Sequence, residues 1–209
     1  MSDDTLTRIQ KKNRNAILEA ALDVFSTYGF RGATIDQIAD ASNLSKTNLL
    51  YYFPSKEILH KTLLDHLLVT WLDPLHEINA DGHPIDEILS YVTRKLEMSR
   101  QFPRESRLFA NEMLRGAPQF RNFLSTDLKT LVDDKAALFS RWMEEGRINK
   151  VHPYHLIFSI WSLTQHYADF DVQVRAILGD EDPFAGAAEF IETVYKRLLV
   201  SRTTDESVN

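Results

Sequence analysis

Residues 45–57 read Ser45-Lys-Thr-Asn-Leu-Leu-Tyr-Tyr-Phe-Pro-Ser-Lys-Glu57, and this stretch decides the fold of the chain. Ser45 is a favourable helix N-cap, because its hydroxyl can accept a hydrogen bond from a free amide of the first turn. Leu49 and Phe53 lie four residues apart and therefore share one buried face. Pro54 disfavours helical backbone at Phe53, so we expect the helix to end there. A helix this short is unstable alone in water and must be docked on a scaffold.

A second short helix precedes this one. Thr34 can cap a helix over residues 35–42, and Asn43 suits the tight turn that follows because Asn tolerates left-handed backbone. Helix, tight turn and helix form the helix-turn-helix pattern, whose second helix can enter the major groove of DNA. The alternative is a pair of surface helices in an ordinary bundle. The adjacent Tyr51 and Tyr52 on the outward face favour DNA binding.

We expect the outward face of the second helix and the two helix N-termini to contact DNA. A helix N-terminus favours phosphate through its free amides and its dipole. The predicted contacts to bases or nearby phosphates are Lys46, Thr47 and Tyr51, the predicted backbone contacts are Thr34, Tyr52 and Lys56, and Ser45 completes the set.

Residues 34–57, preceded by Tyr28-Gly-Phe-Arg-Gly32, resemble the TetR family of bacterial repressors. The run Tyr-Tyr-Phe-Pro-Ser-Lys-Glu is highly specific for that family. The resemblance implies a three-helix DNA-binding domain, a helical ligand-binding domain and a homodimer built from the last two helices of each chain. It also implies a palindromic operator, since a two-fold dimer presents two equivalent reading helices.

Composition agrees with an all-α fold. The chain has 209 residues, of which 44% are hydrophobic, and only 7 Gly and 7 Pro, which favours long helices. It has no cysteine, no apolar run long enough to span a membrane and no signal-like N-terminus, so we expect a cytoplasmic protein without a membrane partner. The net charge is −6, and residues 1–60 contribute none of it because their basic and acidic residues balance. Specificity for DNA must then come largely from groove contacts.

The chain divides into a predicted DNA-binding domain at residues 11–71, with the helix-turn-helix at about 34–53, and a ligand-binding and dimerisation domain at residues 72–209. Residues 1 to about 10 should form a polar arm. Lys11, Lys12 and Arg14 could reach phosphate or the minor groove, and the alternative is that they are simply solvated. No flexible linker separates the domains. We expect about nine helices, at approximately residues 15–28, 35–42, 45–53, 56–71, 84–102, 103–115, 119–145, 153–178 and 182–200.

A further resemblance concerns the effector. The segments beginning at Trp71, Glu97, Phe109 and Ile160 resemble one TetR subgroup, the regulators of pyrimidine utilisation, and the likeness covers nearly the whole chain after about residue 16. It implies a regulator that binds uracil or thymine and then leaves DNA. The chain departs from the subgroup in a shorter N-terminal arm and a different last helix, so a relative that senses another small heterocycle is an alternative.

Five residues are predicted to bind the effector. Trp161 and Gln165 lie one helical turn apart, and they offer a flat stacking surface and a carboxamide that both donates and accepts. The alternative is that Trp161 belongs to the core and that a backbone group satisfies Gln165. Trp71 joins the same pocket by resemblance, and the alternative for it is ordinary core packing. Phe109 and Met113, four residues apart, are predicted walls.

Other classes of function fit less well. His166 and Asp169 have one-turn spacing, but no further ligands support a metal site, and no phosphate loop or catalytic triad is present. We therefore expect no enzyme activity, no metal and no cofactor. The rivals are a TetR-type regulator that senses an unrelated apolar ligand, a helical-bundle hydrolase of small amides, and an architectural DNA-binding protein without a ligand.

Overall fold

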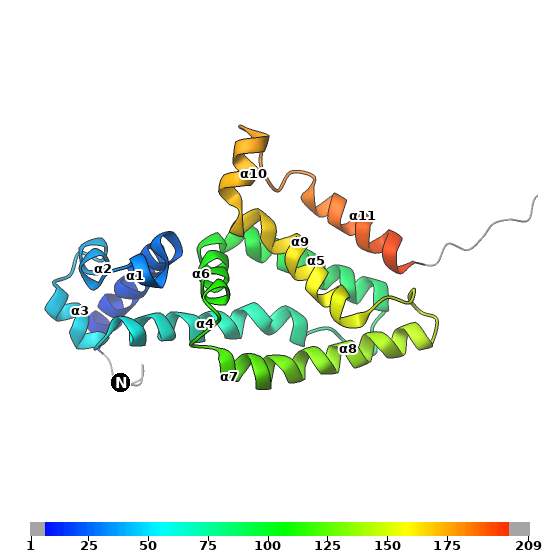
Figure 1. Ribbon diagram of the computed structural model, residues 1–209, viewed down its shortest axis with the longest axis horizontal. Coiled ribbons are helices and arrows are strands. Elements are labelled where there is room, and N and C mark those ends of the chain that lie inside the picture. The colour runs from blue at the N-terminus through cyan, green and yellow to red at the C-terminus, as the bar shows by residue number, and fades with distance from the viewer. Residues whose placement is uncertain (1–6, 201–209) are drawn as a thin grey trace, which may run out of the picture. The chain divides into compact units, whose positions relative to one another are not determined.

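The computed structural model describes residues 7–200, and this part of the chain is helical without a strand (Figure 1). The predicted all-α class is thus confirmed. The chain forms two compact units, one made of residues up to Trp71 together with Phe102–Arg121, and one made of Leu72–Gln101 and the residues from Asn122 onward. The elements are α1 (Arg8–Gly32), α2 (Ile35–Ala41), α3 (Lys46–Tyr52), α4 (Lys56–His76), α5 (Pro84–Gln101), α6 (Pro103–Leu114), α7 (Arg121–Phe123), the π-helical η2 (Leu124–Leu128), α8 (Lys129–Glu144), α9 (Pro153–Asp169), α10 (Asp171–Leu178) and α11 (Ala187–Leu199).

The helix-turn-helix forms as its sequence predicts. Thr34 accepts a hydrogen bond from the amide of Gln37 at 3.2 Å, and Ser45 accepts one from Asn48 at 3.2 Å. Asn43 has a φ of 55°, the left-handed backbone that the turn requires. The last residue of the motif, Phe53, is extended rather than helical, which is the expected effect of the proline after it.

The first helix begins earlier than predicted. Residues 1–6 lie outside the described part of the chain, but α1 starts at Arg8 rather than near residue 15. Thr7 and Gln10 form a reciprocal capping box there, which satisfies the first free amides of the helix. Lys11, Lys12 and Arg14 therefore lie within α1, and their predicted contact with phosphate or the minor groove remains a prediction. Gly29 has a φ of 65° and breaks the helical backbone directly after residue 28, where the first helix was expected to end.

Several later helices differ from the predicted ones. α4 continues past Pro74 to His76, and the helix expected over residues 119–145 contains the π-helical segment η2. The helix expected over residues 153–178 divides at Phe170, whose φ of −114° and ψ of 29° are non-helical. The last helix begins at Ala187, because residues 182–186 form turns instead.

Each unit has its own packing. In the first unit α6 lies against α1, although some 70 residues of sequence separate them, which is why Phe102–Arg121 groups with the N-terminal helices. The predicted division of the chain after residue 71 remains a prediction. In the second unit α5 packs against α9 and α11, and the core includes the fully buried Phe139, Trp142 and Tyr195.

Candidate functional site

The outward face of α3 carries three of the predicted DNA contacts. Lys46, Thr47 and Tyr51 are all exposed, whereas Leu49 on the opposite face is fully buried. Lys46 forms a 3.0 Å ion pair with Asp36 of α2, and both side chains remain exposed. An exposed pair of this kind contributes at most about 1 kcal/mol, so the lysine can exchange its carboxylate partner for a phosphate at little cost.

The hydroxyls of Thr34 and Ser45 are engaged by their own helices. Each accepts a hydrogen bond from the amide three residues further along. They therefore fix where α2 and α3 begin, and the helix N-termini that they define are the features able to meet phosphate. Their predicted contacts with DNA remain predictions.

The second tyrosine of α3 is supported by α1. The Tyr52 hydroxyl accepts a 3.4 Å hydrogen bond from Nδ2 of Asn13, and the ring of Tyr51 lies edge-on to Tyr52 with centroids 5.2 Å apart. The guanidinium of Arg14 lies 5.4 Å from the centroid of Phe53. Asn13 and Arg14 thus help to orient α3, a role that no local sequence pattern indicates because the contacts span about 40 residues.

Lys56 has more partners than the sequence predicts. Its ammonium donates to the carbonyl oxygens of Phe30 at 2.8 Å and Ala33 at 2.7 Å, and it lies 4.5 Å from the centroid of the Phe30 ring. An ammonium has three N–H donors, so one remains for a phosphate. Lys56 therefore ties the start of α4 to the end of α1, and its predicted phosphate contact stays a prediction.

A buried aromatic and charged cluster lies beside Lys56. The guanidinium of Arg115, just after α6, lies 4.5 Å from the Phe30 centroid and is ion-paired at 2.9 Å with the buried Glu112. His60 of α4 packs against Phe25 and Phe30, with ring centroids 4.8 and 4.9 Å away.

His60 itself is held in its neutral form. It is only 2% exposed, and its Nδ1 has no hydrogen-bond partner. Burial, together with the positive charges of Arg115 and Lys56, lowers the pKa of His60 to about 4.

Three of the predicted ligand residues belong to the first unit. Trp71 is 4% exposed and lines a cavity of about 200 Å³. Phe109 packs against Phe120 with centroids 6.4 Å apart, and Met113 is half-buried, but neither lines this cavity. The other lining residues are Leu22, Leu63, His66, Leu67, Thr70, Phe102, Glu105 and Leu108.

The other two predicted ligand residues, Trp161 and Gln165, lie on α9 in the second unit and are half-buried. Nε1 of Trp161 donates a 2.6 Å hydrogen bond to the hydroxyl of Tyr91 on α5. One turn further along α5 lies Lys95, which is 2% exposed and was not predicted. Burial lowers the pKa of Lys95 to about 7, and the carboxylate of Asp169 on α9 acts in the opposite direction.

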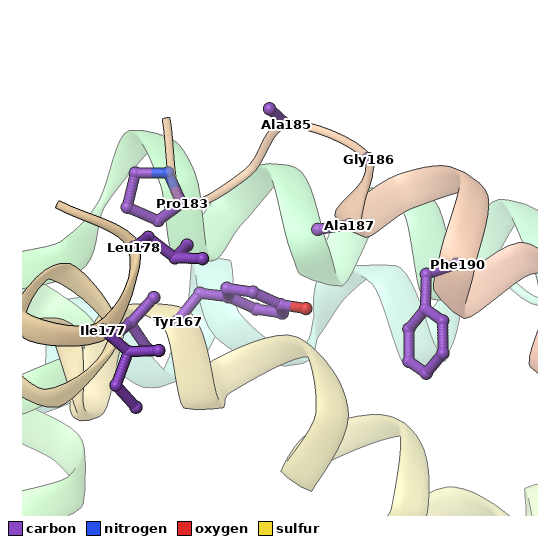
Figure 2. Close-up of a pocket in the computed structure, with 9 residues that line it drawn as sticks. Tyr167, Ile177, Leu178, Pro183, Ala185, Gly186, Ala187 and Phe190 are labelled. Carbon is purple, nitrogen blue, oxygen red and sulfur yellow. The ribbon is translucent and has the colours of Figure 1, made fainter. Parts of the chain in front are cut away.

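A second cavity of the same unit lies between α9, α10 and α11 (Figure 2). Its volume is about 420 Å³, and its lining is almost wholly apolar. Tyr167, Ile177, Leu178 and Phe190 supply the large side chains seen in the close-up.

Some classes of site are not found between residues 7 and 200. No group of three or more His, Cys, Asp or Glu residues there could hold a metal ion. Among the helices of the same residues, none is long and apolar enough to cross a membrane.

Comparison with known proteins identifies the class. Residues 17–61 match the family of "Bacterial regulatory proteins, tetR family", and residues 64–202 match the family "YcdC-like protein, C-terminal region" of TetR-type C-terminal domains. The chain belongs to the TetR family and is a helix-turn-helix transcriptional regulator.

Within the TetR family, the chain is similar to a particular group of regulators. The chain is 49% identical over 173 residues to the HTH-type transcriptional regulator RutR of Escherichia coli, which covers 83% of this chain and 82% of RutR. RutR of Shigella flexneri matches with the same identity and coverage. The fold resembles the crystal structure of AibR in complex with isovaleryl coenzyme A and operator DNA, with a TM-score of 0.70, 19% identity, and coverage of 87% of this chain and 97% of AibR.

Proposed function

We propose that this regulator binds a palindromic operator as a homodimer and releases it when uracil or thymine binds. The observation that carries the proposal is the 49% identity to RutR over 83% of the chain, together with the resemblance of the sequence to the regulators of pyrimidine utilisation. In this role the protein senses its ligand and does not convert it.

Binding to DNA is assigned to α3. The exposed Lys46, Thr47 and Tyr51 would reach base edges or adjacent phosphates in the major groove. Thr34, Ser45, Tyr52 and Lys56 would position the duplex through its backbone, because they lie at the N-termini of α2, α3 and α4 or beside them. The fully buried Leu49 keeps this face oriented outward.

The homodimer is assigned to α9 and α11. Phe158, Phe190 and Leu198 on these helices are 44%, 58% and 40% exposed, which leaves apolar surface in contact with water in a single chain. The apolar cavity of Figure 2 lies at the same helices and would be covered with them. Light scattering at micromolar protein should give twice the mass of one chain, and a stable monomer there would argue against the dimer.

The effector is assigned to Trp161 and Gln165 on α9 of the second unit. The indole N–H of Trp161 is occupied by Tyr91, so its ring face remains for stacking against a flat base. Gln165 offers a donor and an acceptor to the polar edge of a pyrimidine.

The test uses operator DNA selected from a random pool with the full-length protein. Fluorescence anisotropy should show that uracil or thymine releases the labelled operator, while ribose at the same concentration does not. Gln165→Ala should bind the operator as the wild type does but fail to release it at the wild-type uracil concentration. Release of that variant at the same concentration would place the effector elsewhere.

A second candidate is a regulator of the same type that senses an unrelated apolar molecule. The cavity beside Trp71 favours it, because that lining is mainly aliphatic and aromatic. Calorimetry against a panel of free pyrimidines and purines separates the two candidates, since only the first predicts a pyrimidine as ligand. Turnover of uracil by the pure protein would instead indicate an enzyme.

A further inference from the structure

Lys95 is a buried lysine of the second unit, in a position that is usually occupied by an apolar side chain. Its side chain is 2% exposed on α5, among residues that otherwise form an apolar core. Removing an ammonium from water costs several kcal/mol, and an apolar side chain of similar volume often stabilises a core more. Such a lysine is expected where its hydrogen-bonding capacity serves a purpose.

The position of Lys95 connects it to the predicted effector residues. Tyr91 and Lys95 lie four residues apart and face α9 from successive turns of α5. On α9, Trp161, Gln165 and Asp169 are likewise spaced by four, so they share one face. The Tyr91 hydroxyl accepts a hydrogen bond from Trp161, and the carboxylate of Asp169 acts electrostatically on Lys95. Gln165, midway in sequence between Trp161 and Asp169, lies on the same face of α9 as both.

The chemistry of these groups is complementary to an oxo-pyrimidine. The carboxamide of Gln165 can turn over and present its oxygen or its nitrogen, so by itself it does not distinguish a carbonyl from an amino group. An ammonium can only donate, and a carboxylate can only accept. A ring carbonyl beside a ring N–H, as in uracil and thymine, matches that donor and acceptor pair.

We propose that Lys95 donates a hydrogen bond to a ring carbonyl of the effector and thereby makes the site select heterocycles that carry oxo groups. The inference rests on the proposed function, because it concerns the same site.

The experiment measures calorimetric affinities of the full-length protein for uracil and for 2,4-diaminopyrimidine, which has the same ring with amino groups in place of both oxygens. The wild type should bind uracil at least about tenfold more tightly. Lys95→Met should bind uracil about 10- to 100-fold more weakly, which is the usual loss for one charge-assisted hydrogen bond, and should no longer prefer uracil to the same degree.

The matched control is Lys135→Met. Lys135 lies on α8 and donates to the carbonyl oxygens of His76 at 3.0 Å and Ile78 at 2.9 Å, so the same substitution there should leave both affinities within about twofold. Thermal melting of each variant shows that it is folded. If Lys95→Met does not fold, the wild-type preference decides, and equal affinity for the two ligands would overturn the inference.

Two further outcomes separate this inference from the proposed function. If Lys95→Met binds uracil as the wild type does while Gln165→Ala does not, the role of Lys95 is wrong and the pyrimidine effector stands. If the wild type binds neither uracil nor thymine, both the pyrimidine effector and the role of Lys95 are wrong.

Discussion

His60 shows how the surroundings of one residue set its charge. Its ring lies against Phe25 and Phe30, and the nearest charges, Arg115 and Lys56, are both positive. Nothing there favours a second proton, and burial opposes it. His60 therefore contributes to packing at neutral pH, and its protonation in acid destabilises the folded protein.

The first prediction follows from the sign of that shift. The pKa of His60 is about 4 in the folded protein and 6.5 as a model value, so between these values the unfolded chain binds a proton that the folded chain does not. As far as His60 is concerned, the free energy of unfolding therefore has its full value above about pH 6.5 and falls as the pH decreases toward 4. The shift corresponds to about 3 kcal/mol over that window.

Denaturant unfolding at a series of pH values measures this loss. His60→Phe removes the titrating group while keeping an aromatic ring, so its stability should depend less on pH between 6.5 and 4. His66→Phe is the matched control, because His66 lies on the same helix and is exposed. An unchanged pH dependence in His60→Phe would show that other groups cause the acid sensitivity.

At the scale of the element, residues of α3 and α4 are expected to make two kinds of DNA contact, to bases and to backbone phosphates. Tyr51 is 58% exposed near the C-terminal end of α3, on the outward face that would meet bases. Tyr51→Ala should weaken binding to the selected operator by about 1–3 kcal/mol, and binding to scrambled DNA should change much less. Tyr28→Ala, on the similarly exposed tyrosine of α1, is the control, and anisotropy titrations give both affinities. Equal losses on the two DNAs would assign Tyr51 to the backbone instead.

Lys56 at the start of α4 should behave differently. Lys56→Ala should weaken all DNA sequences alike and reduce the slope of log affinity against log salt by about one unit, if its third N–H meets a phosphate. It should also lower stability by about 1–3 kcal/mol, because the carbonyls of Phe30 and Ala33 lose a charged donor. Titrations at several salt concentrations, with melting curves, separate the two effects. A normal salt slope with lower stability would make Lys56 a structural residue only.

The helix boundaries that could be predicted from the sequence are those determined by residues nearby in the chain. Thr34 and Ser45 bond to amides three residues away, and Asn43 and Pro54 act on their own backbone or on the residue before it. The start of α1 at Arg8 also has a local signal, the capping box of Thr7 and Gln10, although the predicted start near residue 15 did not use it. The helical backbone is interrupted at Phe170 without a glycine or proline at that position. We therefore attribute the break between α9 and α10 to tertiary packing and not to local propensity.

The candidate sites were predictable to a smaller degree. The exposed face of α3 follows from helical spacing, whereas the support by Asn13 and the carbonyl partners of Lys56 depend on residues more than 20 positions away. The burial of Lys95 could not be predicted for the same reason. A lysine in an amphipathic helix is usually solvated, and only packing against α9 buries this one.

At the scale of the whole molecule, the two units are joined through continuous helix. α4 runs from Lys56 to His76, and the division between the units falls within it, after Trp71. Lys56 borders the DNA-binding motif, and Trp71 is one of the predicted effector contacts. A helix that carries both is a physical route by which the effector and DNA can influence each other, because it does not bend as freely as a Gly-rich linker.

The last prediction concerns the size of that influence. If uracil weakens the binding of operator by some factor, operator must weaken the binding of uracil by the same factor, typically about 5- to 150-fold. Anisotropy with and without saturating uracil gives the first ratio, and calorimetry with uracil on free protein and on the preformed operator complex gives the second. The two ratios should agree within error. A ratio of one in both experiments, with uracil bound, would mean that the base occupies the protein without controlling DNA, because a ligand with equal affinity for both states shifts no equilibrium.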